Sequence, residues 1–321
     1  MPQARPGRGP LDCRPTPAEP VSRLSDSAPP SAPPPAAPTP PARRTKQLGY
    51  RAGALLLGQL PLRPVSHLYT AAAPRGGPIP NVVRQTWDTA AFGRTHAAYL
   101  ERFRAMNAGW SFELTDNAGC DAYMAANHAG EPILDVYRSA RIGPLRTDIW
   151  RYAVLWRHGG VYCDVNKMLT VPLDELIAPN DRALIAAENT PLLQPVSWQT
   201  DPLPPRARAL LQYPEFNRLN WCLAFEPGHP FLARALERIV ETWPRVRGRP
   251  FDDVKAAVVD WSGPRMWTRA IADVIERDPS VAFTQAGLNF HGFGDQNIRY
   301  SWVRYLQRPS YRHLPGQVIA T

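Results

Sequence analysis

The sequence predicts an α/β fold built on a mainly parallel sheet flanked by helices. Strand-like and helix-like segments alternate between residues 79 and 140, which is the signature of such a sheet. A helix with one apolar stripe then leads into a Gly-Gly pair and a short apolar strand near residue 160. Hydrophobic residues make up 44% of the 321 residues, so the chain can bury a core.

Residues 1–76 are expected to be a disordered leader and linker rich in Pro, Ala and Arg. The first 50 residues hold 14 of the 37 prolines, and residues 2–46 hold only three bulky apolar side chains. Such a segment cannot build a core. The run from Ala71 to Pro78 is typical of a last linker, so the folded domain is expected over residues 77–321.

The elements of the domain follow from their patterns. The expected strands are residues 79–87, 110–114, 161–163, 183–187 and 221–225. The expected helices are residues 94–106, 121–140 with a restart at Pro132, 144–158, 230–243 and 263–276. The aromatic, Gly-rich segment 288–305 has no periodicity that assigns it to either class.

The most informative stretch is residues 142–173. Pro144 suits the first turn of a helix, and Gly159-Gly160 suits its end, where a left-handed residue needs no side chain. The apolar strand that follows ends at Asp164. Ligands of open α/β sheets gather at the carboxyl ends of the strands, so Asp164 is expected at a binding edge.

Four polar residues in this stretch each have two possible roles, one structural and one in a binding site. Asp148 and Arg151 are three residues apart on the helix, which is the spacing of an intrahelical ion pair and also of a shared polar site. Asp164 and Asn166 follow the strand, where they could close a turn with backbone amides or point together at a ligand.

Three short motifs together resemble the DXD-containing sugar transferases, of the yeast α-mannosyltransferase, α-1,4-galactosyltransferase and bacterial capsular-polysaccharide type. They are Asp148-Ile149-Trp150-Arg151-Tyr152, His158-Gly159-Gly160-Val161-Tyr162 and Asp164-Val165-Asn166. The resemblance implies a GT-A type Rossmann-like fold. It also implies transfer, with retention, from a UDP- or GDP-linked sugar to a glycan, lipid or protein acceptor, as in capsule and other polysaccharide biosynthesis.

The resemblance also implies roles for individual residues. Asp164, Arg151 and Asp148 would be the catalytic set. Asp164 would anchor a divalent ion, Mn²⁺ or else Mg²⁺, with Asn166 as a weaker oxygen ligand and His291 as a late histidine that contributes. Hard ions of this kind prefer oxygen ligands. The expected donor-binding residues are Gln85, Trp87, Asp148, Arg151, Asn220, Ser301 and Trp302; Trp87 could stack on a base or belong to the core.

Asn166 departs from the family pattern, which has Asp at this position. One carboxylate fewer leaves less negative charge for the ion, and the adjacent Lys167 makes the loop less acidic still. Three readings stay open: an active enzyme with looser metal binding, an enzyme in which Lys167 or Arg151 supplies part of the charge, and a catalytically degenerate protein that binds sugar nucleotides or serves as a scaffold.

Charge and cysteine usage exclude other classes. The net charge of +9 is located at the ends of the chain, because residues 52–296 carry 25 basic and 25 acidic residues. A nucleic-acid-binding domain would concentrate positive charge on its fold, so no nucleic acid is expected. The four cysteines have no paired spacing, which argues for a reducing, cytoplasmic location. Weak contact of the basic ends with a membrane surface stays open.

Overall fold

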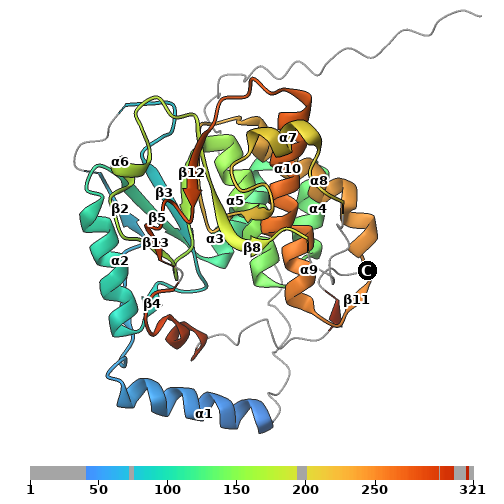
Figure 1. Cartoon of the computed structure of the whole chain (residues 1–321). Helices are drawn as coiled ribbons and strands as arrows, with labels where there is room; N and C mark the ends of the chain where they lie inside the picture. Colours follow the sequence, from blue (N-terminus) through green and yellow to red (C-terminus); the bar gives the residue numbers. More distant parts are fainter. Residues whose placement is uncertain (1–40, 72–75, 194–200, 296, 307–315, 318–321) are drawn as a thin grey trace, which may run out of the picture. The chain divides into compact units, whose positions relative to one another are not determined.

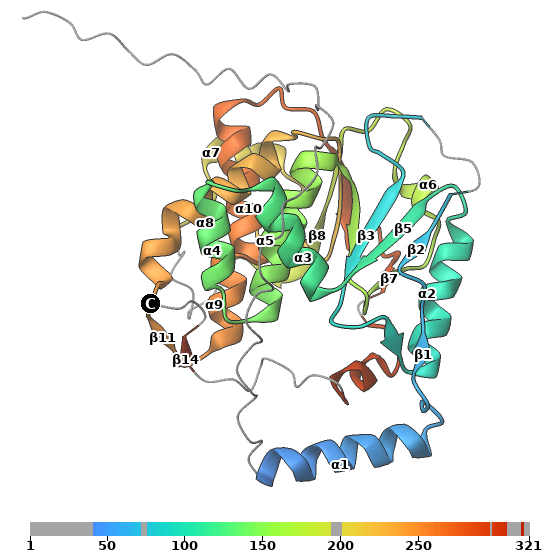
Figure 2. The same cartoon turned by 180° about the vertical axis from the view of Figure 1, so that it is seen from behind.

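The computed structural model describes residues 41–71, 76–193, 201–295, 297–306 and 316–317. The expected disordered leader lies outside them up to residue 40. The described residues from Ala42 onward form one compact unit (Figures 1 and 2). Within the described ranges, no helix has the length and apolar character needed to cross a bilayer.

The centre of the unit is an eight-stranded sheet. Seven strands follow the order β12-β8-β10-β6-β3-β5-β2, and β9 pairs with β8. The pairs β12·β8, β3·β5 and β3·β6 are parallel, whereas β10 runs antiparallel to both β6 and β8, and β2 antiparallel to β5. The strands are β2 (Leu68–Tyr69), β3 (Val82–Thr86), β5 (Ser111–Thr115), β6 (Gly160–Cys163), β8 (Ala183–Pro191), β9 (Phe216–Arg218), β10 (Cys222–Phe225) and β12 (Thr284–Leu288). The predicted mainly parallel sheet is confirmed, because β3, β5, β6, β8 and β12 share one direction.

Helices cover both faces of this sheet. They are α2 (Arg94–Met106), α3 (Asn117–Asn127), α4 (Pro132–Ser139), α5 (Gly143–His158), α6 (Leu173–Leu176), α7 (Pro205–Leu210), α8 (Pro230–Val246), α9 (Val254–Trp261) and α10 (Pro264–Arg277). Tyr162 of β6 packs with α5, α8 and α10, while its neighbours Val161 and Cys163 pack on the other face with Phe103 of α2. This alternation buries both faces of the sheet.

Six further two-residue strands among the described residues form small sheets beside the main one, paired as β1·β4, β7·β13 and β11·β14. They are β1 (Arg63–Pro64), β4 (Ala91–Phe92), β7 (Met168–Leu169), β11 (Pro250–Phe251), β13 (Gly294–Asp295) and β14 (Gly316–Gln317). The aromatic segment 288–305 therefore contributes the end of β12, then β13, and most of the 3₁₀ helix η1 (Ser301–Leu306).

The Gly-Gly pair between α5 and β6 fixes how these two elements meet. Gly159 and Gly160 both have positive φ, 61° and 93°. A Cβ on Gly160 would lie 2.6 Å from the carbonyl oxygen of Val82, so only glycine fits next to β3. The predicted end of the helix is confirmed, and the strand begins one residue earlier than predicted.

The ordered fold starts earlier than the predicted boundary at residue 77. Helix α1 (Pro41–Leu56), β1 and β2 all precede it, and the compact unit begins at Ala42. Leu68 and Tyr69 of β2 pair with β5, and the side chains of Ala54 and Val65 are buried. The sequence does not predict these contacts, because two-residue strands and single buried side chains leave no periodic pattern of apolar residues.

This earlier start predicts a loss of stability on truncation. A chain that begins at Gly77 should melt at a temperature roughly 5 °C or more below one that begins at Ala42, because it loses the buried Val65 and the β2 pairing. Differential scanning calorimetry of the two chains measures the difference. Equal melting temperatures would show that residues 42–76 contribute nothing to the fold.

Candidate functional site

The candidate site lies where β6 ends and β10 begins. Asp164 follows the last residue of β6, and its backbone N–H donates to the carbonyl of Trp221 at 2.8 Å. Because β10 is antiparallel to β6, the residues that precede it, Asn220 and Trp221, lie at the same edge. The sequence expectation that Asp164 stands at a carboxyl-end edge of the sheet is thus met by the structure.

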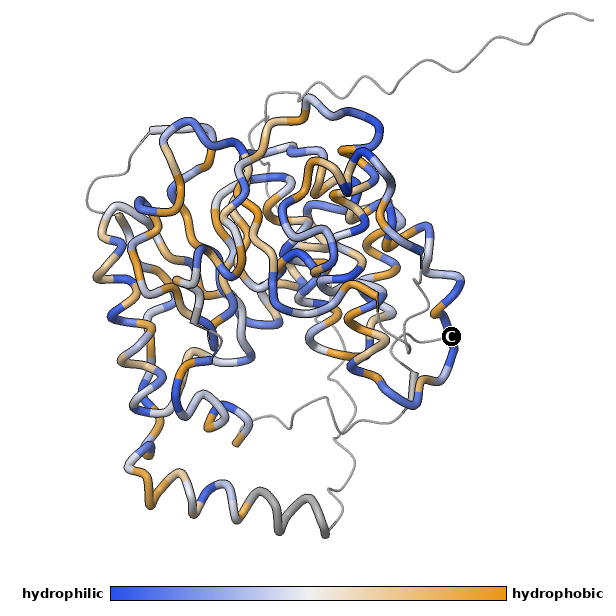
Figure 3. Tube along the Cα trace, in the orientation of Figure 1, coloured by the Kyte–Doolittle hydropathy of each residue, from blue (hydrophilic) through white to orange (hydrophobic). Residues whose placement is uncertain are grey.

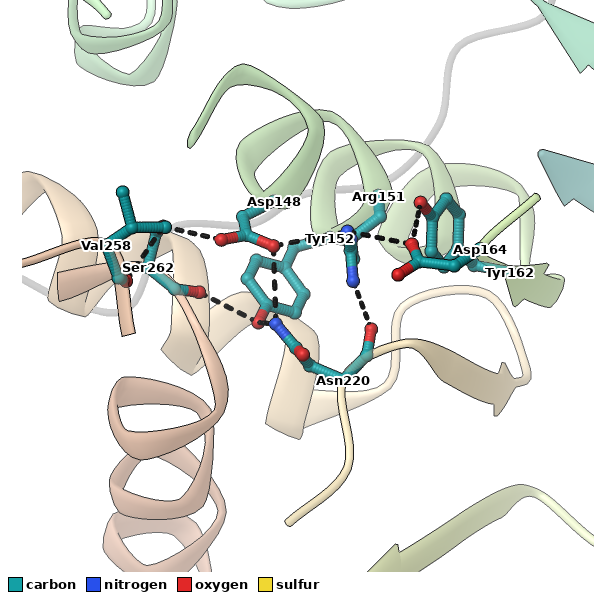
Figure 4. A network of polar contacts seen from close by, with 8 residues as sticks. All are labelled: Asp148, Arg151, Tyr152, Tyr162, Asp164, Asn220, Val258 and Ser262. Carbon is teal, nitrogen blue, oxygen red and sulfur yellow. Dashed lines mark hydrogen bonds and ion pairs between the residues drawn. The ribbon is translucent and has the colours of Figure 1, made fainter. Parts of the chain in front are cut away.

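Arg151, on α5, is the centre of the polar network at this edge (Figure 4). Its Nη2 lies 3.2 Å from Asp164 Oδ1 and 3.3 Å from Asp148 Oδ1, and its Nη1 donates to the carbonyl of Asn220. The guanidinium carbon lies 4.3 Å from the centre of the Tyr162 ring. A single guanidinium therefore ties the helix, the end of β6 and the start of β10 together.

Asp148 is the deeper of the two carboxylates, with 6% of its side chain exposed. Its Oδ2 accepts from the Ser262 hydroxyl at 2.7 Å and its Oδ1 from Asn220 Nδ2 at 3.2 Å. Tyr152 closes the ring of contacts by donating to the Ser262 carbonyl at 3.0 Å. Burial raises the pKa of Asp148 to about 6, against the opposing effect of Arg151, so this carboxyl is mostly ionised at neutral pH.

Asp164 is the carboxylate that reaches solvent. Its side chain is 25% exposed, and its Oδ1 accepts from the Tyr162 hydroxyl at 2.6 Å as well as from Arg151. Across the described residues, its Oδ2 has no hydrogen-bond or ion-pair partner. Burial would lower the pKa of Arg151, but Tyr162, Asp164 and Asp148 outweigh it and raise that pKa, so the guanidinium stays charged.

The turn after β6 carries Asn166 and Lys167. Lys167 N–H donates to the Asp164 carbonyl at 3.1 Å, which closes the turn through the backbone alone. The half-buried Asn166 side chain forms no hydrogen bond with any described residue. The side chains of Asp164 and Asn166 therefore do not cap this turn, and oxygen atoms of both stay available at the edge.

The late aromatic segment lies against this turn. Strand β13 pairs with β7, which follows the turn, and Ile298 N–H donates to the Asn166 carbonyl at 3.0 Å. Ser301 is buried, whereas the ring of Trp302 packs against Tyr50 of α1, with ring centroids 5.6 Å apart. The structure brings this segment to the site, but Trp302 faces α1.

The remaining predicted residues divide between core and surface. Trp87 is half-buried, packs in an apolar cluster with Val65, Leu114 and Val165, and meets Tyr305 edge to face at 6.0 Å. This environment favours a core role for Trp87 over a free stacking face. Gln85 is 2% exposed, and its Nε2 finds no partner among the described residues.

His291 is exposed in the turn after β12, with a φ of 57°. None of its described contacts joins it to Asp164 or Asn166, so its metal-binding role stays a prediction. No group of three His, Cys, Asp or Glu side chains within the described ranges is placed to hold a metal ion.

Residues 94–183 match a family model described as a glycosyltransferase sugar-binding region containing a DXD motif. Over this region the chain is therefore similar to DXD-containing glycosyltransferases. The predicted resemblance is confirmed. The matched region contains Asp148, Arg151, Asp164 and Asn166, which are the same residues that the structure brings to the sheet edge.

Two fungal relatives of this chain are both named initiation-specific alpha-1,6-mannosyltransferases. The Candida albicans protein is 25% identical over 60% of the chain, and the Schizosaccharomyces pombe protein is 26% identical over 64%. The chain spans about half the length of these relatives, 52% and 51%. A solved structure, the PaToxG glycosyltransferase, aligns with a TM-score of 0.41 and 13% identity over 73% of this chain and 81% of that one.

Several residues of the network are not predicted by the sequence patterns. Tyr152 and Tyr162 lie inside the motifs, but the motifs assign no role to their hydroxyl groups. Ser262 directly precedes Gly263-Pro264 and the start of α10, but it carries no sequence signal of its own. Glu188 of β8 is a further carboxyl group in this half of the sheet. Burial raises the pKa of Glu188 to about 7, although the charge of Lys167 acts to lower it.

The Ser262 hydroxyl is predicted to stabilise the ionised form of Asp148. Ser262→Ala should lower the free energy of unfolding by about 1–3 kcal/mol at pH 8, because a buried carboxylate loses a donor. The pKa of Asp148 in the folded protein is about 6, above its ordinary value of 3.8. The favourable contribution of Asp148 to the free energy of unfolding is therefore complete below pH 3.8 and is lost as the pH rises through about 6. The variant raises that pKa further.

The cost of Ser262→Ala should therefore be larger at pH 8 than at pH 5, in urea unfolding at both values. Ser139→Ala is the matched control, because its hydroxyl donates to the Val136 carbonyl at 2.9 Å and its cost should not change with pH. A cost for Ser262→Ala that is the same at both pH values would contradict the assigned role of the hydrogen bond.

Proposed function

We propose that this chain is a glycosyltransferase that moves a sugar from a nucleotide-activated donor to a glycan, lipid or protein acceptor. The observation that carries the proposal is the buried Arg151, which holds Asp148 and Asp164 together at the sheet edge inside the sugar-binding region of the family. Retention of the anomeric configuration, a UDP- or GDP-linked donor, a cytoplasmic location and a place in capsule or other polysaccharide biosynthesis are parts of the same proposal.

The geometry suits a reaction in which charge separates. Breaking the bond between the sugar and the diphosphate builds positive charge on the anomeric carbon and negative charge on the leaving group. Fixed charges in a site shielded from water stabilise such a separation without having to reorient. Arg151 is fixed by two carboxylates and a carbonyl, so its charge and theirs are oriented before any donor arrives.

The exposed side of Asp164 and the amide of Asn166 fit a divalent ion. Both offer oxygen, the atom that hard ions such as Mn²⁺ and Mg²⁺ prefer, and neither oxygen is used by the turn. A divalent ion would supply positive charge next to the departing diphosphate. Asp164 and Asn166 would hold it, with Mn²⁺ as the first candidate and Mg²⁺ as the second.

The names of the two fungal relatives suggest which donor sugar to test first. Both fungal relatives are named mannosyltransferases, so a mannosyl donor is the first to be tested. The acceptor is left at the level of its class. The alternative function is a degenerate family member that binds a sugar nucleotide without turning it over. Asn166 in place of a carboxylate is the specific observation that favours it.

Turnover should depend on the charge of Asp164. Asp164→Asn keeps the volume of the side chain but removes the charge, so donor hydrolysis or transfer should fall by about 100-fold or more. The matched control is Asp135→Asn, an exposed aspartate on α4, which should leave turnover unchanged. The assay is release of nucleotide from UDP- and GDP-sugars with and without Mn²⁺.

Wild-type turnover in a folded Asp164→Asn variant would overturn the assigned role of this carboxylate. Absence of turnover with every donor, together with tight binding of a nucleotide sugar, would instead establish that the chain is a degenerate protein that binds sugar nucleotides without catalysis. Circular dichroism melting of each variant shows whether it is folded.

Asn166→Asp tests the departure from the family pattern. The change adds a negative charge at nearly constant volume, so Mn²⁺ should bind about tenfold or more tightly. Calorimetric titration of Mn²⁺ with UDP or GDP present measures the affinity. An unchanged affinity in the folded variant would show that Asn166 does not face the ion.

A further inference from the structure

Helix α1 presents an apolar face to solvent. Leu48, Leu55 and Leu56 are 68%, 66% and 87% exposed, which makes them among the most exposed large hydrophobic side chains of the described residues. Leu48, Ala52 and Leu55 follow each other at spacings of four and three, so they lie on one side of the helix, and Ala52 is exposed as well. The hydropathy of α1 from Leu48 onward can be followed in Figure 3.

The opposite side of α1 is attached to the fold. The Tyr50 ring meets Trp302 at 5.6 Å, a Cβ on Gly53 would lie 3.8 Å from the same ring, and Ala54 is fully buried. Directly after the helix, the Gln59 side chain accepts from the Thr95 N–H at 2.9 Å. The leucines therefore remain at the surface because the other face of the helix is already occupied.

The helix is also strongly basic. Residues 41–56 contain four basic residues, Arg43, Arg44, Lys46 and Arg51, and no acidic residue. Arg51 is exposed beside Leu48 and Leu55 on the helix surface. This charge repels a second copy of the same face and attracts an anionic one. An apolar face flanked by positive charge is the property of helices that lie in the interface of an anionic membrane.

We propose that α1 docks this domain on an anionic lipid surface, with the exposed leucines inserted among the acyl chains and Arg51 at the headgroups. The helix has 16 residues, fewer than the roughly 20 that span a bilayer, so it lies in the plane of the interface. The proposal does not depend on the proposed function. It does place the η1 segment, which α1 contacts through Trp302, close to the lipid surface.

Co-sedimentation of the full chain with vesicles tests the proposal. The vesicles are phosphatidylcholine alone and an equal mixture of phosphatidylcholine and phosphatidylglycerol. Wild type should bind the anionic vesicles and leave the neutral ones largely free. Binding should weaken at high salt, because the charges are screened.

Three variants separate the two contributions. Leu55→Ser with Leu56→Ser should weaken binding about tenfold or more, because two side chains no longer leave water. Arg51→Gln should weaken it about fivefold at low salt. The matched control is Leu210→Ser on α7, where the leucine is 45% exposed outside α1 and binding should stay at the wild-type value.

Failure of wild type to bind the anionic vesicles would overturn the proposal, as would wild-type binding by the double leucine variant. Sedimentation equilibrium without lipid tests the alternative that a second copy of the chain covers this face of α1. If wild type dimerises, the double leucine variant is monomeric, and neither binds vesicles, the face is an interface between two copies of the chain and the proposal is wrong.

Discussion

The buried guanidinium of Arg151 is the constraint on which the rest of the site depends. Removing a charge from water is costly, and the structure offsets the cost with two carboxylates, a carbonyl and the face of an aromatic ring. These partners come from α5, the end of β6 and the segment before β10. The Gly159-Gly160 turn is what allows α5 and β6 to meet at this spacing.

The two carboxylates bound to Arg151 have different environments. Asp148 is enclosed by Ser262 and Asn220, so its charge serves the network. Asp164 keeps one oxygen free at the edge, beside an Asn166 amide that no backbone group uses. A site for a charged donor requires an exposed charge that is already oriented before the donor binds. Asp164 meets this requirement, because the enclosed network of Asp148 and Arg151 holds it in place.

The sequence predicts the sheet, nearly all of the longer helices and the residues of the sheet edge, because each leaves a local pattern. The apolar stripe, the Gly-Gly pair and the Asp-x-Asn spacing all lie within one stretch of chain. Ser262 and Asn220 are 114 and 72 residues from Asp148, and their contacts depend on how α9, α10 and β10 pack. The sequence does not predict helix α1, because only one face of this proline-flanked segment is in contact with the fold: Tyr50 meets Trp302, and Ala54 is buried.

We propose that the fork of Arg151 orients Asp164 for a metal-bound nucleotide. Arg151→Lys keeps the charge but cannot contact Asp148, Asp164 and the Asn220 carbonyl at once. Calorimetric titration of Mn²⁺ with UDP or GDP into wild type and this variant measures the consequence. We expect a folded variant that binds the metal–nucleotide pair at least about tenfold more weakly. Equal affinity in the two folded proteins would contradict it.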